Sequence, residues 1–288
     1  MAVDVLAEIL TNRALSRDYN VLGFAAPEIA QRARPGQFVM VRPTDGSDPL
    51  LRRPFSIFEI LRDAGGEPVG ISILNKRIGV GTSRLYSARP GDKLSILGPL
   101  GKSWLDVVAN SHESLDAQSW FVAGGVGLAP FVTLAEHLAA KTQPMKLFYG
   151  GRSKSDLYYA SFFEALGATV HLTTEDGTAG EKGRITLPLE RELRARSGTS
   201  VTLYACGPTP MMRAVASLGQ SFDARTIVSL EPVMGCGMGG CYSCVVKVTD
   251  ETHRSLGEGG REHSHFVRAC LEGPVFDAAR VQWDALAH

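Results

Sequence analysis

The chain has 288 residues, 44% of them hydrophobic, and its 30 basic residues balance its 30 acidic ones. This length predicts two or three domains with ordinary globular cores. The neutral balance gives no reason to expect nucleic acid or an anionic membrane as a partner, and no apolar run is long enough for a transmembrane helix.

Short β-strands are predicted across residues 5–100, because β-branched and aromatic runs alternate there with Gly and Pro turns. Many short strands at close spacing are typical of a barrel or sandwich. We therefore expect residues 1–105 to form a β-barrel domain. Its clearest predicted strands span 19–24, 37–42, 55–60, 69–74 and 93–97.

Two segments of this domain carry residues suited to a phosphorylated, flat ligand. Arg52–Ser56 places Arg beside an aromatic ring and a hydroxyl, which can pair with a phosphate, stack on a ring and bond its edge. Gly79–Leu85 opens a short predicted helix with glycines, which predicts a phosphate cradle. Taken singly, a solvated Arg beside a core Phe is the commoner explanation of the first segment, and a simple Gly turn into a helix explains the second equally well.

Both segments, with Leu74-Asn-Lys76 between them and Leu97-Gly-Pro-Leu-Gly101 after them, occur in the order and spacing of a known family. They resemble the flavin domain of the ferredoxin–NADP reductase superfamily. The resemblance implies that the barrel binds FAD. The residues it implies are Arg53, Pro54, Phe55 and Ser56 at the flavin ring, Leu74, Asn75 and Lys76 beside it, and Gly81 and Thr82 at the pyrophosphate.

From Ser119 onward, short buried strands alternate with helical segments. Strand 120–123, the glycine turn 124–130 and helix 131–140 form the first βα unit, and this alternation predicts a doubly wound parallel sheet. Ligands of such sheets bind at the carboxyl ends of the strands. We assign residues 106–228 to this α/β domain. Further strands are expected at 146–149, 169–174 and 200–205, and further helices at 161–166, 189–195 and 210–216.

Two turns of this domain, Gly124–Pro130 and Tyr204–Pro208, resemble the pyridine-nucleotide motifs of the same superfamily. The resemblance implies NAD(P)H as co-substrate, with Cys206 as the catalytic residue near nicotinamide and flavin; a small buried hydrophobe is the alternative for Cys206. Arg152 and Lys154 suit a 2′-phosphate or a solvated turn, so NADH and NADPH both remain open. The implied nucleotide-binding residues are Gly124, Gly125, Gly127, Pro130, Gly207 and Pro208.

The last sixty residues contain four of the five cysteines. Cys236, Cys241 and Cys244 follow a C-x4-C-x2-C spacing, and Cys270 stands further on, which is the plant-type pattern of a [2Fe–2S] cluster. A structural zinc site or clustered core thiols are the alternatives. Because four cysteines fit a ligand set and the fifth stands alone, disulfides are not expected, and we predict a reducing, cytoplasmic location. Residues 229–288 are taken as a small cluster domain.

The order barrel, nucleotide domain and cluster domain, with the closing segment Cys270–Asp277 and the loop Thr174–Gly183, resembles one subfamily. It is similar to the electron-transfer subunits of NAD-dependent dihydroorotate dehydrogenase, although the segment from Cys244 to Cys270 is longer than usual there. The resemblance implies an FMN-containing catalytic partner, a heterotetramer and a role in pyrimidine biosynthesis, with electrons leaving to NAD+.

Three other functions remain open from the sequence. The same cofactors would serve a small subunit of a bifurcating ferredoxin–NADP oxidoreductase or of a hydrogenase. They would also serve an oxygenase reductase, although its cluster domain is usually longer. A zinc-stabilised binding module without flavin is the alternative from another class.

Overall fold

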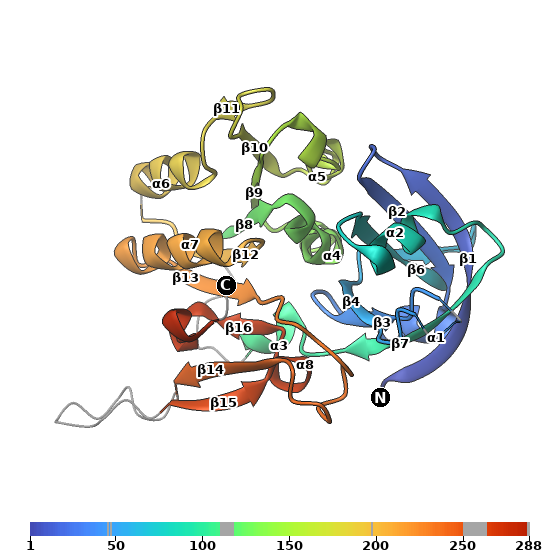
Figure 1. The fold of residues 1–288 in the computed structure, drawn as a ribbon. Helices are drawn as coiled ribbons and strands as arrows, with labels where there is room; N and C mark the ends of the chain where they lie inside the picture. Colours follow the sequence, from blue (N-terminus) through green and yellow to red (C-terminus); the bar gives the residue numbers. More distant parts are fainter. Residues whose placement is uncertain (45, 47, 110–117, 197, 250–263, 287–288) are drawn as a thin grey trace.

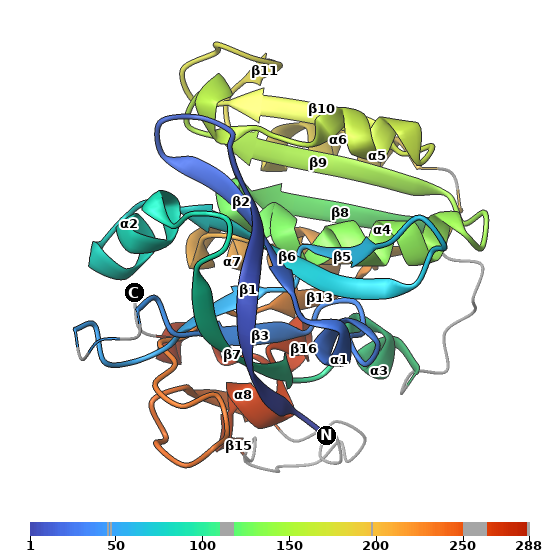
Figure 2. The same cartoon turned by 90° about the vertical axis from the view of Figure 1, so that its right-hand side faces the viewer.

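The computed structural model describes residues 1–44, 46, 48–109, 118–196, 198–249 and 264–286. Figures 1 and 2 show an N-terminal barrel packed beside a larger α/β layer, with a small C-terminal hairpin below both. No helix in the described part of the chain is long and apolar enough to cross a membrane.

The N-terminal part is one antiparallel sheet of seven strands in the order β4-β3-β7-β1-β2-β6-β5. Its core holds fully buried aliphatic and aromatic side chains such as Ile9, Leu22 and Phe24. Two helices, α1 (Pro27–Ala30) and α2 (Val80–Ser87), interrupt the strand sequence. The strands are β1 (Val3–Ala14), β2 (Tyr19–Ala25), β3 (Phe38–Val41), β4 (Arg53–Ser56), β5 (Glu59–Arg62), β6 (Pro68–Lys76) and β7 (Lys93–Leu100).

The two edge strands of this sheet, β4 and β5, follow each other directly in the sequence, so the sheet curls round until its edges meet at this junction. The single strand expected at 55–60 is wrong: it divides into the end of β4 and the start of β5. Between them, Ile57 N–H donates to the Gln37 carbonyl just before β3, and Phe58 N–H donates to the Ser72 carbonyl on β6. The switch of partners within two residues draws the edges together, and the predicted barrel is confirmed.

The second part is a seven-stranded sheet in the order β11-β10-β9-β8-β12-β13-β16. Six strands are parallel, and β16 pairs antiparallel with β13. The strands are β8 (Gln118–Gly124), β9 (Met145–Gly151), β10 (Thr169–Thr174), β11 (Glu181–Lys182), β12 (Val201–Cys206), β13 (Arg225–Ser229) and β16 (Val275–Asp277).

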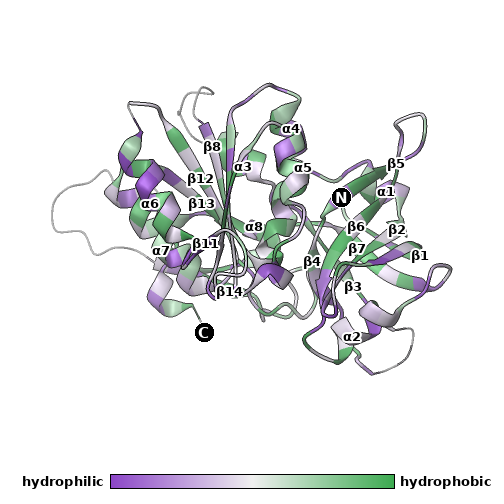
Figure 3. Ribbon diagram, turned by 90° about the horizontal axis from the view of Figure 1, so that it is seen from above, coloured by the Kyte–Doolittle hydropathy of each residue, from purple (hydrophilic) through white to green (hydrophobic). Residues whose placement is uncertain are grey.

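Helices cover both faces of this sheet, as expected for a doubly wound domain. Seen from above in Figure 3, α4 and α5 lie on one side and α6 and α7 on the other. The chain reverses its direction of winding between β8 and β12, which is where such sheets bind ligands. The helices are α3 (Trp104–Ala109), α4 (Val132–Ala139), α5 (Ala160–Ala165), α6 (Thr186–Ala195) and α7 (Thr209–Ser221).

The helix expected at 131–140 begins differently. A 3-10 segment, η1 (Gly125–Phe131), follows β8 and passes into α4. Pro130 lies inside this segment, is buried, and its carbonyl accepts a hydrogen bond from Trp104 Nε1 at 3.0 Å. Proline lacks the N–H that an α-helix interior needs, so the chain tightens here before the regular helix starts.

The C-terminal part is a hairpin of β14 (Val245–Thr249) and β15 (Ser264–Arg268), followed by α8 (Ala269–Glu272). The chain then adds β16 to the edge of the nucleotide sheet, where Arg225 and Asp277 form an ion pair at 3.1 Å. The hairpin is therefore tied to the α/β domain through its own continuation. Residues 250–263, most of the long segment between Cys244 and Cys270, lie outside the described residues.

Candidate functional site

The two predicted flavin motifs lie side by side. A Cβ atom on Gly81, at the start of α2, would stand 3.7 Å from Arg53 Nε on β4. Arg53 directs Nη1 to the carbonyls of Leu51 and Arg52 at 2.9 and 3.2 Å, which holds its guanidinium near the helix start. Arg52 is turned away to Asp4. A cation beside a close-packed glycine at a helix start suits a phosphate.

The surroundings of this cradle fit a large apolar ring as well as a phosphate. Leu50 and Leu51, just before β4, and Ile78 and Val80, around the start of α2, are exposed apolar side chains. Apolar surface gathered beside a cationic cradle fits a ligand that carries both phosphate and a flat ring system, as FAD does.

The Thr82 side chain is hydrogen-bonded within its own loop rather than presented as a free phosphate ligand. Its hydroxyl accepts hydrogen bonds from the N–H groups of Ile78 and Gly79 at 2.9 and 3.0 Å, and it lies 3.1 Å from the Gly79 carbonyl. The side chain therefore closes the loop that begins α2. Asn75, fully buried, donates from Nδ2 to the Thr82 carbonyl at 3.0 Å and fixes this loop to β6.

The remaining flavin-motif residues divide between core and groove. Leu74 is buried in the core. Pro54, Phe55 and Ser56 are half-buried along β4. Lys76, at the end of β6, reaches away from the barrel and lines the groove of the nucleotide domain.

The two nucleotide motifs are packed against each other at the carboxyl ends of β8 and β12. A Cβ on Gly127 would overlap the Cys206 carbonyl oxygen and lie 2.7 Å from Gly207 N, and one on Gly124 would lie 2.8 Å from Pro208 Cδ. Only glycine allows so close an approach. These residues come together as predicted by the sheet topology, whereas Pro130 is buried beneath Trp104 and is not among the groove-lining residues.

A groove with a volume of about 1210 Å³ runs along this edge of the sheet. That volume exceeds the range of roughly 300–1,000 Å³ of ordinary small-molecule sites, so a dinucleotide has room. Residues of all three parts of the chain line it, among them Lys76, Gly125, Arg152, Arg184, Glu231 and Ser243. Lys154, which the sequence paired with Arg152, does not line it; Arg184, not foreseen, does.

Cys206 lies at the end of β12 and is fully buried. Its Sγ is 3.7 Å from Oε1 of Glu231, a residue that sequence reasoning missed because it stands in no motif. Burial, and then the neighbouring carboxyl, raise the pKa of the Cys206 thiol well above its usual range. Glu231 opens to the groove, yet the surrounding protein raises the pKa of its carboxyl.

The four C-terminal cysteines are arranged in two pairs. The Cys241 thiol contacts Cys236, and the Cys270 thiol contacts Cys244, with Cys236 also close to Cys270. Cys244 and Cys270 are buried, whereas Cys241 is exposed. In the described part of the chain, no three His, Cys, Asp or Glu side chains gather closely enough to hold one metal ion. Two pairs of thiols suit the two irons of a [2Fe–2S] cluster better than one zinc ion.

The loop around these thiols supplies polar hydrogens to sulfur. Met238 N–H donates to Cys236 Sγ at 3.3 Å, and the Ser243 hydroxyl lies 3.1 Å from Cys241 Sγ. Contacts from Ser243, and then Cys236, lower the pKa of Cys241 to about 6. Burial, and then Cys244, raise the pKa of Cys270 to about 12. The exposed edge of the loop therefore favours thiolate, the form that binds iron.

Two family models match the chain. The model of the oxidoreductase NAD-binding domain matches residues 121–217, and that of the iron-sulfur cluster binding domain of dihydroorotate dehydrogenase B matches residues 231–282. Both matches coincide with the groove and the paired cysteines.

Curated relatives match along nearly the whole chain. The electron transfer subunit of dihydroorotate dehydrogenase B (NAD(+)) from Desulforamulus reducens is 35% identical over 96% of this chain and 98% of its own length. The protein of the same name from Geobacillus kaustophilus is 36% identical over 88% of each chain.

Solved structures share the fold. The NADH-dependent reduced ferredoxin-NADP oxidoreductase, studied for flavin-based electron bifurcation, has a TM-score of 0.78 and 27% identity, covering 97% of this chain and 91% of that chain. An Amycolatopsis cytochrome P450 reductase has a TM-score of 0.61 and 24% identity over 77% of this chain and 66% of that chain, a likeness of fold alone.

Proposed function

The chain belongs to the family of electron transfer subunits of dihydroorotate dehydrogenase B (NAD(+)), and from this we propose what it does. It passes electrons between a partner FMN-containing dihydroorotate dehydrogenase and NAD+, by way of a [2Fe–2S] cluster and FAD, in pyrimidine biosynthesis. The observation that carries the proposal is the groove, because it joins barrel, nucleotide domain and cluster loop in one continuous wall.

FAD bound here would supply two-electron exchange with a nicotinamide and single-electron exchange with a [2Fe–2S] cluster. The residues of the chain hold these groups. Arg53 and the start of α2 hold the FAD phosphates, with Thr82 and Asn75 fixing the loop. Gly124 and Gly127 let the dinucleotide approach the sheet edge. Cys206 lies buried at the end of β12 beside Glu231, which lines the groove where the nicotinamide end would bind.

The paired cysteines hold the cluster, with Cys236 and Cys241 on one side and Cys244 and Cys270 on the other. Arg268 supports this loop: its Nη1 donates to the Gly239 carbonyl at 3.0 Å, and its guanidinium carbon lies 5.0 Å from the centre of the Tyr242 ring. A fixed positive charge beside the loop stabilises the reduced, more negative cluster.

Replacing Arg268 with glutamine is expected to lower the reduction potential of the cluster by on the order of tens of millivolts, because one positive charge is lost nearby. Redox titration followed by electron paramagnetic resonance measures the potential. Arg77→Gln, on the distant barrel, is the matched control. An unchanged potential in the Arg268 variant would show that its charge does not act on the cluster.

Exposed apolar side chains surround the cluster loop. Met238 and Tyr242 lie on the loop itself and Leu271, on α8, lies against Gly239 of the loop, and all three are exposed. Large apolar side chains gathered on one surface mark a protein interface. This rim is where we place the FMN-containing partner, since it surrounds the exposed Cys241.

Met238→Asp is expected to weaken binding of the partner by about tenfold or more, because it buries a charge in the interface. Titration of the FMN-containing subunit, followed by sedimentation or calorimetry, measures this. Leu6→Asp changes a similarly exposed apolar residue on the barrel and leaves binding unchanged. Reduction of the flavin by NADH continues in both variants. Equal affinity of the two variants would place the partner on another surface.

Several finer statements belong to the same proposal. The names of the relatives favour NADH over NADPH. We propose a heterotetramer of two such chains with two catalytic chains, located in the cytoplasm. We also propose the divisions 1–105, 106–228 and 229–288 as domains, with β16 as the link that ties the third to the second.

A second function has one observation in its favour. The bifurcating oxidoreductase structure covers nearly all of this chain. A small subunit in such a complex would use the same cofactors with another partner. Purification from the native host decides between them: an FMN-containing dihydroorotate dehydrogenase co-purifies under our proposal, and a chain that never associates with one would refute it.

A further inference from the structure

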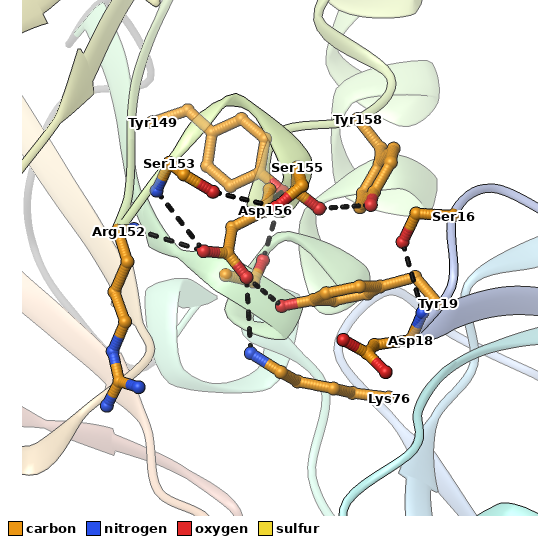
Figure 4. A network of polar contacts seen from close by, with 11 residues as sticks. Ser16, Asp18, Tyr19, Lys76, Tyr149, Arg152, Ser153, Ser155, Asp156 and Tyr158 are labelled. Carbon is orange, nitrogen blue, oxygen red and sulfur yellow. Dashed lines mark hydrogen bonds and ion pairs between the residues drawn. The ribbon is translucent and has the colours of Figure 1, made fainter. Parts of the chain in front are cut away.

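Among the contacts between the barrel and the nucleotide domain, one short segment, Asp156–Tyr159, between β9 and α5, carries a polar network. Its side chains reach from the nucleotide domain onto strands of the barrel, as Figure 4 shows around Asp156. We call these four residues the clasp.

Asp156 is the polar centre of the clasp. Its Oδ1 accepts hydrogen bonds from the Tyr19 hydroxyl at 2.8 Å and from Lys76 Nζ at 3.2 Å, both on the barrel. Its Oδ2 accepts the N–H groups of Arg152 and Ser153 at 3.2 and 3.3 Å, from its own domain. One carboxylate therefore binds both domains. Burial would raise its pKa, but the bonds from Tyr19 and Lys76 outweigh this and lower the pKa.

Two aromatic rings extend the clasp. The Tyr158 ring lies 4.9 Å from that of Tyr19, and the Tyr159 ring packs edge-on against Phe58 at 4.6 Å. Arg13 of the barrel donates to the Tyr159 hydroxyl and lies over its ring. These contacts join two chain segments that are far apart in sequence.

The backbone of the clasp is held in an unfavourable conformation. Tyr159 has φ of 59°, in the left-handed region that a bulky residue rarely adopts. Such a conformation persists only where the surroundings determine it, and it concentrates at functional sites. Here the contacts of both tyrosine rings with the barrel hold the backbone in this conformation.

The clasp reaches the groove through Asp156. Lys76, Gly125 and Asp156 all line the groove. The Tyr149 hydroxyl lies 3.1 Å from the Gly125 carbonyl and 2.9 Å from the Asp156 carbonyl. A Cβ on Gly125 would stand 3.7 Å from the Tyr19 hydroxyl. The residues that join the domains are thus in contact with the glycine turn of the nucleotide site.

From this geometry we propose that Asp156 is a positioning residue for the exchange between nucleotide and flavin. It fixes the barrel against the nucleotide domain so that a nicotinamide in the groove faces the flavin ring, and it holds the Lys76 ammonium in the groove. Asp156 touches neither reacting atom; it acts through Tyr19 and Lys76. The inference rests on the proposed function, since it assumes that both groups bind where we place them.

The test uses the full chain with its flavin and cluster in place. Asp156→Asn keeps the size of the side chain and removes its charge. We expect unchanged FAD and iron content, a reduction of flavin by NADH about tenfold slower (about 1.4 kcal/mol), and a weaker long-wavelength charge-transfer band between nicotinamide and flavin. Asp18→Asn, which removes an exposed carboxylate paired with Arg77 on the barrel, is the control and leaves all three unchanged.

A second variant separates positioning from folding. Lys76→Met removes one of the partners of Asp156, and the double variant is expected to be no slower than the worse single variant, because both act through one contact. Fully additive effects, or a charge-transfer band and rate equal to wild type in Asp156→Asn, would overturn the proposal. Loss of FAD from Asp156→Asn would also overturn it in favour of a structural role. Wild-type protein whose flavin NADH never reduces would refute the proposed function instead.

Discussion

Cys270→Ser is expected to abolish electron delivery to the partner subunit while the flavin is still reduced by NADH. Cys270 is buried and is one member of the second thiol pair, so no solvent-exposed group can replace it. Loss of a metal's outer-shell support alone costs 10–100-fold, and loss of a ligand is expected to cost at least about 100-fold in delivery. Iron and sulfide content and visible absorbance measure the loss of the cluster. Stopped-flow kinetics measure reduction of the flavin by NADH and of the partner subunit.

The control for this prediction is the one cysteine outside the ligand set. Cys206→Ser, at the end of β12, is expected to keep full iron and sulfide content and to slow only the exchange with NADH. Should Cys270→Ser retain a normal cluster, or Cys206→Ser lose it, the assignment of the four ligands would be wrong.

Gly127→Ala is expected to damage the nucleotide site. The added carbon would overlap the Cys206 carbonyl, and its nearest neighbours are backbone atoms, which cannot move aside as a flexible side chain can. Overpacking of this kind costs about 1–3 kcal/mol or more. We expect a lower melting temperature, measured by calorimetry, and at least about tenfold weaker NADH binding, measured by titration.

Gly65→Ala is the matched control, because the nearest atom to its added carbon is the end of the Asp63 side chain at a surface turn. It should bind NADH as the wild type does. Equal NADH affinity and melting temperature in Gly127→Ala would mean that the two glycine motifs are not packed as described.

The proposed ligands of the cluster could be named from the sequence because their signal is local. Spacing alone selects Cys236, Cys241 and Cys244, and the structure then pairs Cys244 with Cys270 across the hairpin. The barrel and the doubly wound sheet were likewise predictable, since alternating strands and βα units have short-range patterns. The division of strand 55–60 could not be predicted, because the change of hydrogen-bond partner at Ile57 and Phe58 does not alter the hydropathy pattern.

Contacts between domains were the part that sequence reasoning could not reach. Glu231 stands beside Cys206 only because β12 and the segment after β13 end at the same edge of the sheet. In the sequence Asp156 is an ordinary loop carboxylate. Only in the folded chain do Tyr19 and Lys76 of the barrel donate hydrogen bonds to it. Lys76 itself was assigned to the flavin by resemblance, whereas its ammonium points to the groove and to Asp156.

The central claim is that this chain connects an FMN-containing dihydroorotate dehydrogenase to NAD+. The most direct measurement combines the purified chain, loaded with FAD and cluster, with the dihydroorotate dehydrogenase of the same host and follows NADH formation at 340 nm after dihydroorotate is added. We predict NAD+ reduction that requires both proteins and is lost in Cys270→Ser. NADH formation at the same rate without this chain, or none with both proteins fully loaded, would contradict the account.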